Sequence, residues 1–304
     1  MSGVIQANGL TRRFGKKLAV ADLDFEVPEG SVYAFLGRNG AGKTTTIHLL
    51  LNLIEPTRGR AVVLGRESTR LGPPELVEIG YVSENQRLPG WMTVGELLAY
   101  VRPLYPTWDP DFCRALAARF GLPLGGRLRD LSRGMRMKAA LLVSLAYRPR
   151  LLVLDEPFSG LDPAVREDLT SGILERAGPD GWTVFVSSQD IDEVERLADW
   201  VAILEEGRLL VAESLADLQR RFRRIEALAG DDGAIPPGVP SSWLHVERAG
   251  RTVRLVDSRY TERSDAEAGQ ILGASEVRVS SMSLREIFLA LTRRQAPPLE
   301  PVNP

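Results

Sequence analysis

The chain has 304 residues, of which 44% are hydrophobic and 26% are charged, and these average values exclude a disordered or fibrous protein. Its 38 basic and 40 acidic residues give a formal net charge of -2, which argues against a protein whose main partner is nucleic acid. The single cysteine, Cys113, excludes an internal disulfide framework and a cysteine-based zinc site. No apolar run of 18 residues and no signal-peptide pattern is present, so we expect a cytoplasmic protein that reaches a membrane only through a partner.

Short apolar runs alternate with longer amphipathic stretches along most of the chain, which is typical of a mostly parallel sheet covered by helices. Polar and apolar residues alternate over 22–27, which predicts a half-exposed antiparallel strand. Helical spacing interrupted by prolines predicts a mostly helical insertion over 92–146. Further strands are expected at 31–36, 151–154, 183–187, 200–204 and 208–211, and helices at 44–53 and 164–176. The last two of these strands are expected to form a hairpin.

The pattern changes after Arg224, where we expect a domain boundary. Loop residues cluster at 230–233 and 236–238, and the apolar runs at 243–246 and 252–256 are short and alternating. Ser283 and Glu286 form the S-x-x-E pattern of a capping box, which predicts a final helix over 284–292. We therefore expect a main domain over 3–224, a small α+β domain over 225–294, and a proline-rich disordered tail over 295–304.

A phosphate-binding loop is predicted between the strand at 31–36 and the helix that follows it. Residues 37–44 match the pattern G-x-x-x-x-G-K-[ST], whose glycines let backbone amides approach phosphate oxygens. Lys43 supplies a positive charge for the outer phosphates, and the Thr44 hydroxyl is a ligand for Mg²⁺. The expected nucleotide contacts in this loop are Gly37, Arg38, Asn39, Gly40, Ala41, Gly42, Lys43, Thr44 and Thr45.

Two acids follow the apolar strand at 151–154. Asp155 is expected to hold Mg²⁺ through water, and Glu156 to orient or deprotonate the water that attacks the outer phosphate. Either acid alone would fit a solvated strand end. Together with the phosphate-binding loop, they indicate a nucleotide-hydrolysing enzyme that uses ATP and Mg²⁺.

With two further segments, these elements resemble the nucleotide-binding subunit of ATP-binding cassette (ABC) transporters. Residues 131–135, Leu-Ser-Arg-Gly-Met, look like the L-S-G-G-Q signature of that superfamily, and Ser132 stands 23 positions before Asp155. Residues 159–162, Ser-Gly-Leu-Asp, resemble the D-loop, which ends here in Asp162. Phe14, 29 positions before Lys43, occupies the place where family members stack an aromatic ring on adenine, although a lone phenylalanine is also compatible with a core position.

The resemblance implies a P-loop NTPase of the ABC type, with a RecA-like core, an antiparallel β subdomain and a helical subdomain over about 88–146. It implies a head-to-tail homodimer, or a heterodimer with a second ABC ATPase, in which ATP lies between Lys43 of one subunit and the signature of the other. Ser132 and Gly134 would then face the γ-phosphate. It also implies a separately encoded membrane permease, which places the chain at the inner face of the cell membrane.

Two positions depart from the family pattern. Glu84 stands where most members have a Mg²⁺-contacting glutamine, and a carboxylate remains an oxygen ligand for the metal. Gln189 stands where members carry a switch histidine after the strand at 183–187, and its amide can donate a hydrogen bond but carries no charge. We therefore expect ATP binding and dimer closure with slower turnover than in a histidine-bearing homologue.

Residues 225–294, which end in Ser-Leu-Arg-Glu-Ile-Phe-Leu-Ala-Leu-Thr at 283–292, resemble the extension of drug-export and antibiotic-resistance ABC subunits. Together with the segment at 105–109, this resemblance favours an exporter. Two alternatives remain: a nucleotide-gated regulatory subunit with weak hydrolysis, and an ABC ATPase acting on nucleic acid or ribosomes, although no nucleic-acid partner is expected. The loop at 88–93 either contacts the permease or caps the helical subdomain. The arginines at 220, 221, 223 and 224 form either a solvated helix face or a contact for anionic lipid.

Overall fold

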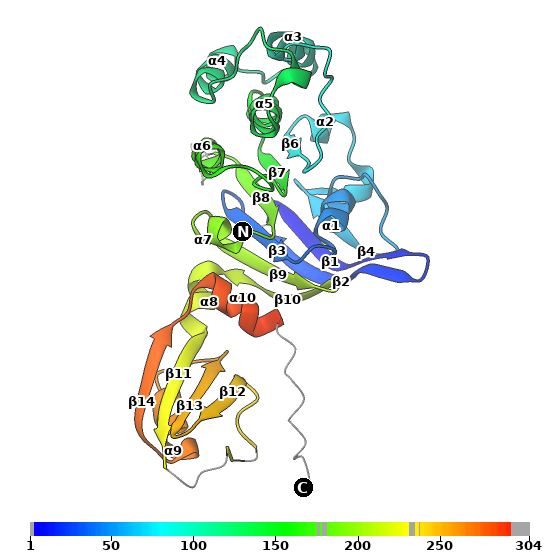
Figure 1. Ribbon diagram of the computed structural model, residues 1–304. Coiled ribbons are helices and arrows are strands. Elements are labelled where there is room, and N and C mark those ends of the chain that lie inside the picture. Colours follow the sequence, from blue (N-terminus) through cyan, green and yellow to red (C-terminus); the bar gives the residue numbers. More distant parts are fainter. Residues whose placement is uncertain (1–2, 175–176, 178–180, 231–234, 237, 293–304) are drawn as a thin grey trace. The chain divides into compact units, whose positions relative to one another are not determined.

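A computed structural model describes residues 3–174, 177, 181–230, 235–236 and 238–292 (Figure 1). The chain divides into two compact units, Met1–Ala212 and Glu213–Pro304. This division lies ahead of the expected boundary near Arg224, because Arg221 bonds to Glu213 and donates 2.6 Å to the carbonyl of Ser258 within the second unit. The expected tail over 295–304 lies outside the described residues.

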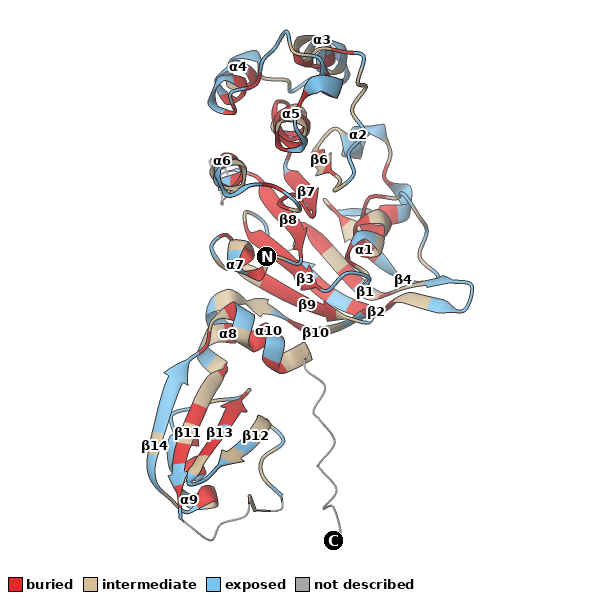
Figure 2. Cartoon of the chain, in the orientation of Figure 1, coloured by how far each residue is buried: buried red, intermediate tan, exposed pale blue. Residues whose placement is uncertain are grey.

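The first unit is built on a six-stranded sheet with the order β10-β9-β3-β8-β7-β6. Strand β3 pairs in parallel with β8 and β9, and β7 pairs in parallel with β6 and β8. Every residue of β3, β7 and β8 is buried, which explains their short, continuous apolar sequences (Figure 2). The strands are β3 (Val32–Gly37), β6 (Ile79–Val82), β7 (Leu151–Asp155), β8 (Thr183–Ser188), β9 (Trp200–Glu205) and β10 (Arg208–Ser214). The predicted strands and hairpin are confirmed.

A second, antiparallel sheet has the order β2-β1-β4-β5. Buried and exposed residues alternate along the second half of β2, as predicted for 22–27. Its strands are β1 (Ile5–Phe14), β2 (Lys17–Val27), β4 (Arg58–Val63) and β5 (Arg66–Glu67).

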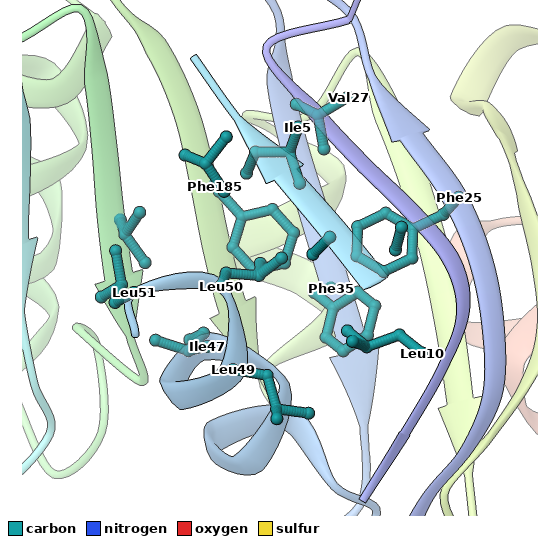
Figure 3. Close-up of a cluster of buried hydrophobic side chains, with 14 of the residues drawn as sticks. Ile5, Leu10, Phe25, Val27, Phe35, Ile47, Leu49, Leu50, Leu51 and Phe185 are labelled. Carbon is teal, nitrogen blue, oxygen red and sulfur yellow. The ribbon is translucent and has the colours of Figure 1, made fainter. Parts of the chain in front are cut away.

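Helix α1 (Lys43–Leu50) lies between the two sheets, in contact with strands of both. Figure 3 shows its side chains, among them Ile47 and Leu49, packed with residues from both sheets. The rings of Phe25, Phe35 and Phe185 meet there, with centroids 5.5 Å apart for Phe25 and Phe35 and 5.3 Å apart for Phe35 and Phe185. This core fixes the start of α1, and with it the loop that precedes the helix.

Helices cover the other side of the central sheet and form the segment between β6 and β7. Figure 1 shows α6 (Pro163–Leu174) and α7 (Ile191–Glu195) on the side of the central sheet opposite α1. The predicted helical segment contains α3 (Val94–Val101), α4 (Pro110–Arg119) and α5 (Arg133–Leu145), with short 3-10 turns at Arg102–Leu104 and Leu128–Asp130. A 3-10 turn at Ser68–Arg70 and the short helix α2 (Pro73–Leu76) precede β6. In the part of the chain that the structure describes, no helix is long and apolar enough to span a membrane.

The described part of the second unit contains a four-stranded antiparallel sheet with the order β12-β13-β11-β14 and the helices α8, α9 and α10. Helix α9 packs on one face through Ala268 and Leu272, which contact the buried residues of β11 and β13. Ser283 and Glu286 exchange capping hydrogen bonds of 2.8 and 3.3 Å at the start of α10, as predicted. The elements are α8 (Leu215–Arg221), β11 (Arg223–Ala229), β12 (Trp243–Ala249), β13 (Thr252–Asp257), α9 (Ser264–Leu272), β14 (Ala274–Ser281) and α10 (Leu284–Thr292).

The arginine cluster does not form the single helix face proposed from the sequence. Helix α8 ends at Arg221, so Arg223 and Arg224 belong to strand β11. Both side chains interact within the second unit: Arg224 pairs with Glu286 at 2.7 Å, and Arg223 lies over the ring of Tyr260. The sequence did not predict the end of the helix, because strand β11 begins at Arg223, directly after Phe222, the residue that caps α8.

Candidate nucleotide-binding site

The glycine-rich loop between β3 and α1 has the backbone that a phosphate-binding loop requires. Gly40 and Gly42 have φ values of 81° and 112°, which are strained for residues with a Cβ. A Cβ at Gly42 would lie 2.5 Å from the carbonyl oxygen of Ala19, and one at Gly37 would lie 2.6 Å from that of Leu204. The spacing of glycines therefore follows from close backbone approaches to β2 and β9.

A cavity of about 170 Å³ opens beside this loop. Its lining brings together the loop, the start of α1 and acids from two distant segments. It contains Lys17, Ala19, Asn39, Gly40, Gly42, Lys43, Thr44, Thr45, Glu84 and Glu156. Gly37, Arg38 and Ala41 belong to the same loop but are not among the lining residues. No sequence motif marks Lys17 or Ala19, although lysine is rare in this chain and Lys17 lies close to the expected adenine contact.

Lys43 is a buried cation at the centre of the site. Its Nζ donates to the carbonyl of Gly37 at 2.6 Å and to that of Arg38 at 3.3 Å. The same atom lies 2.9 Å from Oε1 of Glu156, and both side chains are almost fully buried. The loop therefore holds its positive charge in place against a carboxylate from the end of β7.

Glu156 combines a strained backbone with a perturbed carboxyl group. Its φ is 50°, in the region that disfavours residues with a Cβ. Burial raises the pKa of the Glu156 carboxyl above its ordinary value, and the charge of Lys43 opposes that shift. Oε2 accepts a hydrogen bond of 3.2 Å from the backbone amide of Gln189. A carboxylate with a raised pKa in a cavity is suited to accept a proton.

Asp155 is held by Ser187, a residue that the sequence analysis did not single out. The Ser187 hydroxyl donates to Oδ1 of Asp155 at 2.6 Å and accepts from the amide of Glu156 at 3.1 Å. Asp155 is 2% exposed and is not among the lining residues of the cavity. The signal for Ser187 was available, because a polar residue at the end of a buried parallel strand lies beside the end of its neighbour.

Glu84 connects three of the predicted motifs. Its Oε1 accepts a hydrogen bond of 3.3 Å from the hydroxyl of Ser159 and lies 4.0 Å from Nη2 of Arg133. A Cβ at Gly160 would lie 2.7 Å from Nη1 of Arg133, so this arginine packs directly on the segment after the acids. Glu84, which stands where most family members have glutamine, therefore lies beside Arg133, the third residue of the signature-like segment.

The signature-like segment and Asp162 begin helices outside the cavity. The Ser132 hydroxyl caps α5 by accepting from the amide of Met135 at 3.2 Å, and Gly134 packs against Val165. Asp162 accepts from the amide of Val165 at 3.0 Å at the start of α6. Within one chain, the structure does not bring these three residues to Lys43.

Gln189 and Phe14 lie at the margin of the site. Gln189 is exposed directly after β8, and only its backbone amide contacts Glu156. Phe14 is 45% exposed at the end of β1, opposite Lys17 in the strand register, with the Arg12 guanidinium 4.6 Å from its ring centroid. The core alternative for Phe14 is thereby wrong, and the ring is available to a planar ligand.

The oxygen donors fit a cation that is bound mainly by phosphate. Among the described residues, no three His, Cys, Asp or Glu side chains gather closely enough to hold a metal by themselves. Thr44 and Glu84 contribute a hydroxyl and a carboxylate to the same cavity, and Asp155 is held beside Glu156. Mg²⁺ at nucleotide sites keeps several waters and takes few protein ligands, which this donor set satisfies.

Comparison with known proteins gives a consistent family. A family model described as ABC transporter matches residues 20–159, and one described as AAA domain, putative AbiEii toxin, Type IV TA system, matches 127–195. The chain is 32% identical to the daunorubicin resistance ATP-binding protein DrrA3 of Streptomyces coeruleorubidus, over 95% of each chain. It is 30% identical to the Nod factor export ATP-binding protein I of Rhizobium leguminosarum bv. viciae, over 96% of this chain and 95% of that one. The solved ATP-binding subunit of an ABC transporter matches 71% of this chain and 92% of its own, with a TM-score of 0.66 and 27% identity.

Proposed function

The chain belongs to the ATP-binding proteins of ABC transporters and is an ABC-type ATPase coupled to transport, and from this premise we propose how its own residues bind and hydrolyse ATP. The single observation that carries the proposal is the buried ion pair between Lys43 of the glycine-rich loop and Glu156. Lys43 and the loop amides bind the phosphates, and Glu156 accepts the proton of the attacking water. Asn39, Gly40, Thr44 and Thr45 complete the phosphate contacts, and Phe14 stacks on the adenine.

The state of Glu156 depends on Lys43. The Lys43 charge stabilises the Glu156 carboxylate, while burial destabilises it. Phosphate oxygens that bind Lys43 would weaken this stabilisation, whereas the charge of Mg²⁺ bound with the nucleotide would favour the carboxylate. The burial of Glu156 and the contact with Lys43 together keep the proton acceptor beside the phosphates.

Mg²⁺ would be held by Thr44, by Glu84 and, through water, by Asp155. It would supply positive charge that neutralises the phosphates during transfer. Glu84 is a candidate for this position because Glu84 and Thr44 line the same cavity. Ser187 keeps Asp155 in place.

Two chains enclose ATP in our proposal. Ser132 and Gly134 lie at the start of α5, away from the cavity of their own chain, and would complete the site of a second ABC ATPase subunit. The second subunit is either another copy or a different ABC ATPase. ATP then favours the closed dimer and hydrolysis reopens it, which is a ligand-biased two-state element.

The partner is a separately encoded permease, so we place the chain at the inner face of the cell membrane. The most exposed large apolar side chains of the helical segment are Trp91, Tyr100 and Leu104, which are 70%, 65% and 60% exposed. Met92, next to Trp91, is buried, so the loop at 88–93 both caps the segment and presents an apolar surface. The names of the relatives, which refer to drug resistance and to Nod factor export, support export as the direction of transport.

A weakly hydrolysing regulatory subunit is the second candidate. The observation that favours it is the side chain of Gln189, which is uncharged and exposed where a switch histidine would stand. The two candidates differ in the chemical step and agree on ATP binding and on the family.

Replacing Glu156 by Gln tests the proposal. The amide cannot accept the proton, so single-turnover hydrolysis of ATP in the presence of Mg²⁺ should fall by about 100-fold or more, while ATP still binds. Glu78→Gln is the matched control, because Glu78 pairs with Arg150 at the surface and should leave the rate unchanged.

Two results would contradict the ATPase mechanism. If wild type hydrolyses ATP no faster than Glu156→Gln while both bind the nucleotide, the regulatory candidate replaces it. If neither protein binds ATP, the assignment of the glycine-rich loop as a phosphate-binding loop is wrong.

A further inference from the structure

Strand β14 leaves one side of the C-terminal sheet open. Among the described strands its only neighbour is β11, which pairs with it without a register shift from Arg223 opposite Ser281 to Leu228 opposite Glu276. Six of its eight residues are exposed, and Figure 2 shows it exposed along most of its length. The unpaired backbone groups of such an edge can accept another strand.

The opposite edge of the same sheet is protected. Strand β12 has an irregularity between Leu244 and Glu247, where His245 adopts a φ of 50°. Bulges of this kind interrupt the regular row of backbone donors and acceptors and prevent further pairing. The irregularity of β12 lies inside the strand, whereas the register shift between β14 and β11 lies near the start of β14, between Ala274 and Glu276. The pairing of β14 with β11 is therefore regular from Glu276 to Ser281.

Two copies of β14 would have complementary charges, because the strand carries one acidic and one basic residue close together. Glu276 and Arg278 lie on the same face of the strand and pair with each other at 2.8 Å. In an antiparallel pair of two β14 strands centred on Val277, Glu276 of each copy lies opposite Arg278 of the other. Sliding one strand by two residues, which keeps the same side chains on this face, places Glu276 opposite Glu276 in one direction and Arg278 opposite Arg278 in the other. One register alone satisfies both charges on both copies.

We propose that β14 is a docking edge for a second copy of this chain, joining two four-stranded sheets into one continuous antiparallel sheet about a two-fold axis. Such an isologous contact uses the same residues on both sides, which the self-complementary charges favour. An edge of eight residues is small, so the contact is weak in dilute solution and strengthened when a shared partner holds two copies together. The contact needs no nucleotide and involves none of the residues proposed to bind ATP.

The charges provide a test with reciprocal variants in the full chain. In Glu276→Arg alone, and in Arg278→Glu alone, two copies would bring like charges together in the favoured register. Mixing the two variants restores opposite charges at both positions. Glu262→Arg is the matched control, because Glu262 is exposed in the turn before α9 and does not belong to β14.

The measurement is sedimentation velocity over a range of protein concentrations, without nucleotide and at low salt. We expect wild type and Glu262→Arg to show concentration-dependent dimers. Each single edge variant should raise the dissociation constant by about tenfold or more, and the equimolar mixture should return to within about threefold of wild type.

Three outcomes overturn the proposal. Wild type that stays monomeric up to about 100 μM, a concentration in the range of weak association, excludes the contact. Single variants that dimerise as wild type does place the dimer contact on another surface. A mixture that stays as weak as its components, while wild type dimerises, excludes this register. ATP-dependent dimers can still form in each case, so these failures leave the proposed ATPase function untouched.

Discussion

Glu156, the residue proposed to accept the proton, has a buried carboxylate and a strained backbone. Its carboxylate is buried beside Lys43, and its backbone is held at φ 50° by the amide contacts to Ser187. Strained, buried acids of this kind persist where the surrounding fold over-determines them. The packing of β7 against β8 supplies that constraint, because it aligns Asp155 with Ser187.

Phe14 gives a prediction that separates base recognition from phosphate recognition. Phe14→Ala should raise the dissociation constant for ATP by about fivefold or more, since stacking of a base on an aromatic ring is worth about 1–3 kcal/mol. The affinity for inorganic tripolyphosphate should not change, and Phe14→Trp should preserve ATP binding. Equilibrium titration of wild type and both variants measures this. An equal loss of affinity for tripolyphosphate would assign Phe14 a purely structural role.

Gln189 gives a prediction about the chemical step. Gln189→His should speed single-turnover hydrolysis by about tenfold, because a charged donor makes a stronger hydrogen bond to the γ-phosphate than a neutral amide does. Gln189→Asn is the control, since it keeps a neutral amide and shortens the side chain. Rapid-quench measurement of one turnover at saturating ATP gives the rates. No gain, or a loss, in the histidine variant would mean that Gln189 does not limit the reaction.

At the scale of elements, two glycines that both lie inside helices differ in how closely their neighbours pack against them. Gly172 in α6 faces Phe120, and a Cβ there would lie 2.9 Å from Cζ of this buried ring. Gly269 in α9 has only Val277 nearby, at an ordinary contact distance of 3.5 Å. One glycine therefore permits close packing, while the other only lowers helix propensity.

The matched substitutions should change stability in opposite directions. Gly172→Ala should lower the free energy of unfolding of its unit by about 1 kcal/mol, because overpacking exceeds the gain in helix propensity. Gly269→Ala should raise that of the C-terminal unit by about 0.5–1 kcal/mol. Calorimetric unfolding of the full chain measures both shifts. A stabilising effect of Gly172→Ala as large as that of Gly269→Ala would show that Phe120 yields without cost.

At the scale of the whole molecule, the chain joins two units with separate cores, and the first presents an apolar surface beyond its core. The buried residues of a C-terminal core cluster come from β11, β12, β13 and α9, and Ala274 and Val277 of β14 pack against them. The exposed residues Trp91, Tyr100 and Leu104 belong to the helical segment of the first unit. Such side chains mark a surface that a partner covers.

Recruitment by the permease is tested at Trp91. Trp91→Glu should greatly reduce the amount of the chain recovered with membranes of its own cells, because it places a charge in the apolar contact. The ATPase rate of the isolated variant should equal that of wild type. Leu53→Glu is the matched control, since Leu53 is 56% exposed outside the helical segment. Undiminished recovery of Trp91→Glu with membranes would remove this surface from the permease contact.

The sequence predicted most of the first unit because its signals are local. A glycine-rich loop before Lys43, apolar strands and capping residues depend on neighbours in the chain. It did not identify Ser187 or Lys17, which reach the site through strand pairing and a hairpin. It also placed Arg223 and Arg224 on a helix, because helix ends depend on contacts made by residues far away in the chain.

By itself, the sequence predicted an α/β nucleotide-hydrolysing enzyme, because its motifs combine fixed residue types with fixed spacing, and the resemblance to a known family added the ABC type. Only the tertiary structure decided which residues meet: Glu156 with Lys43, Glu84 with Ser159, and β14 as an open edge. These contacts join segments that are far apart in the chain. Their geometry depends on how strands and helices pack, which no local pattern of residues specifies.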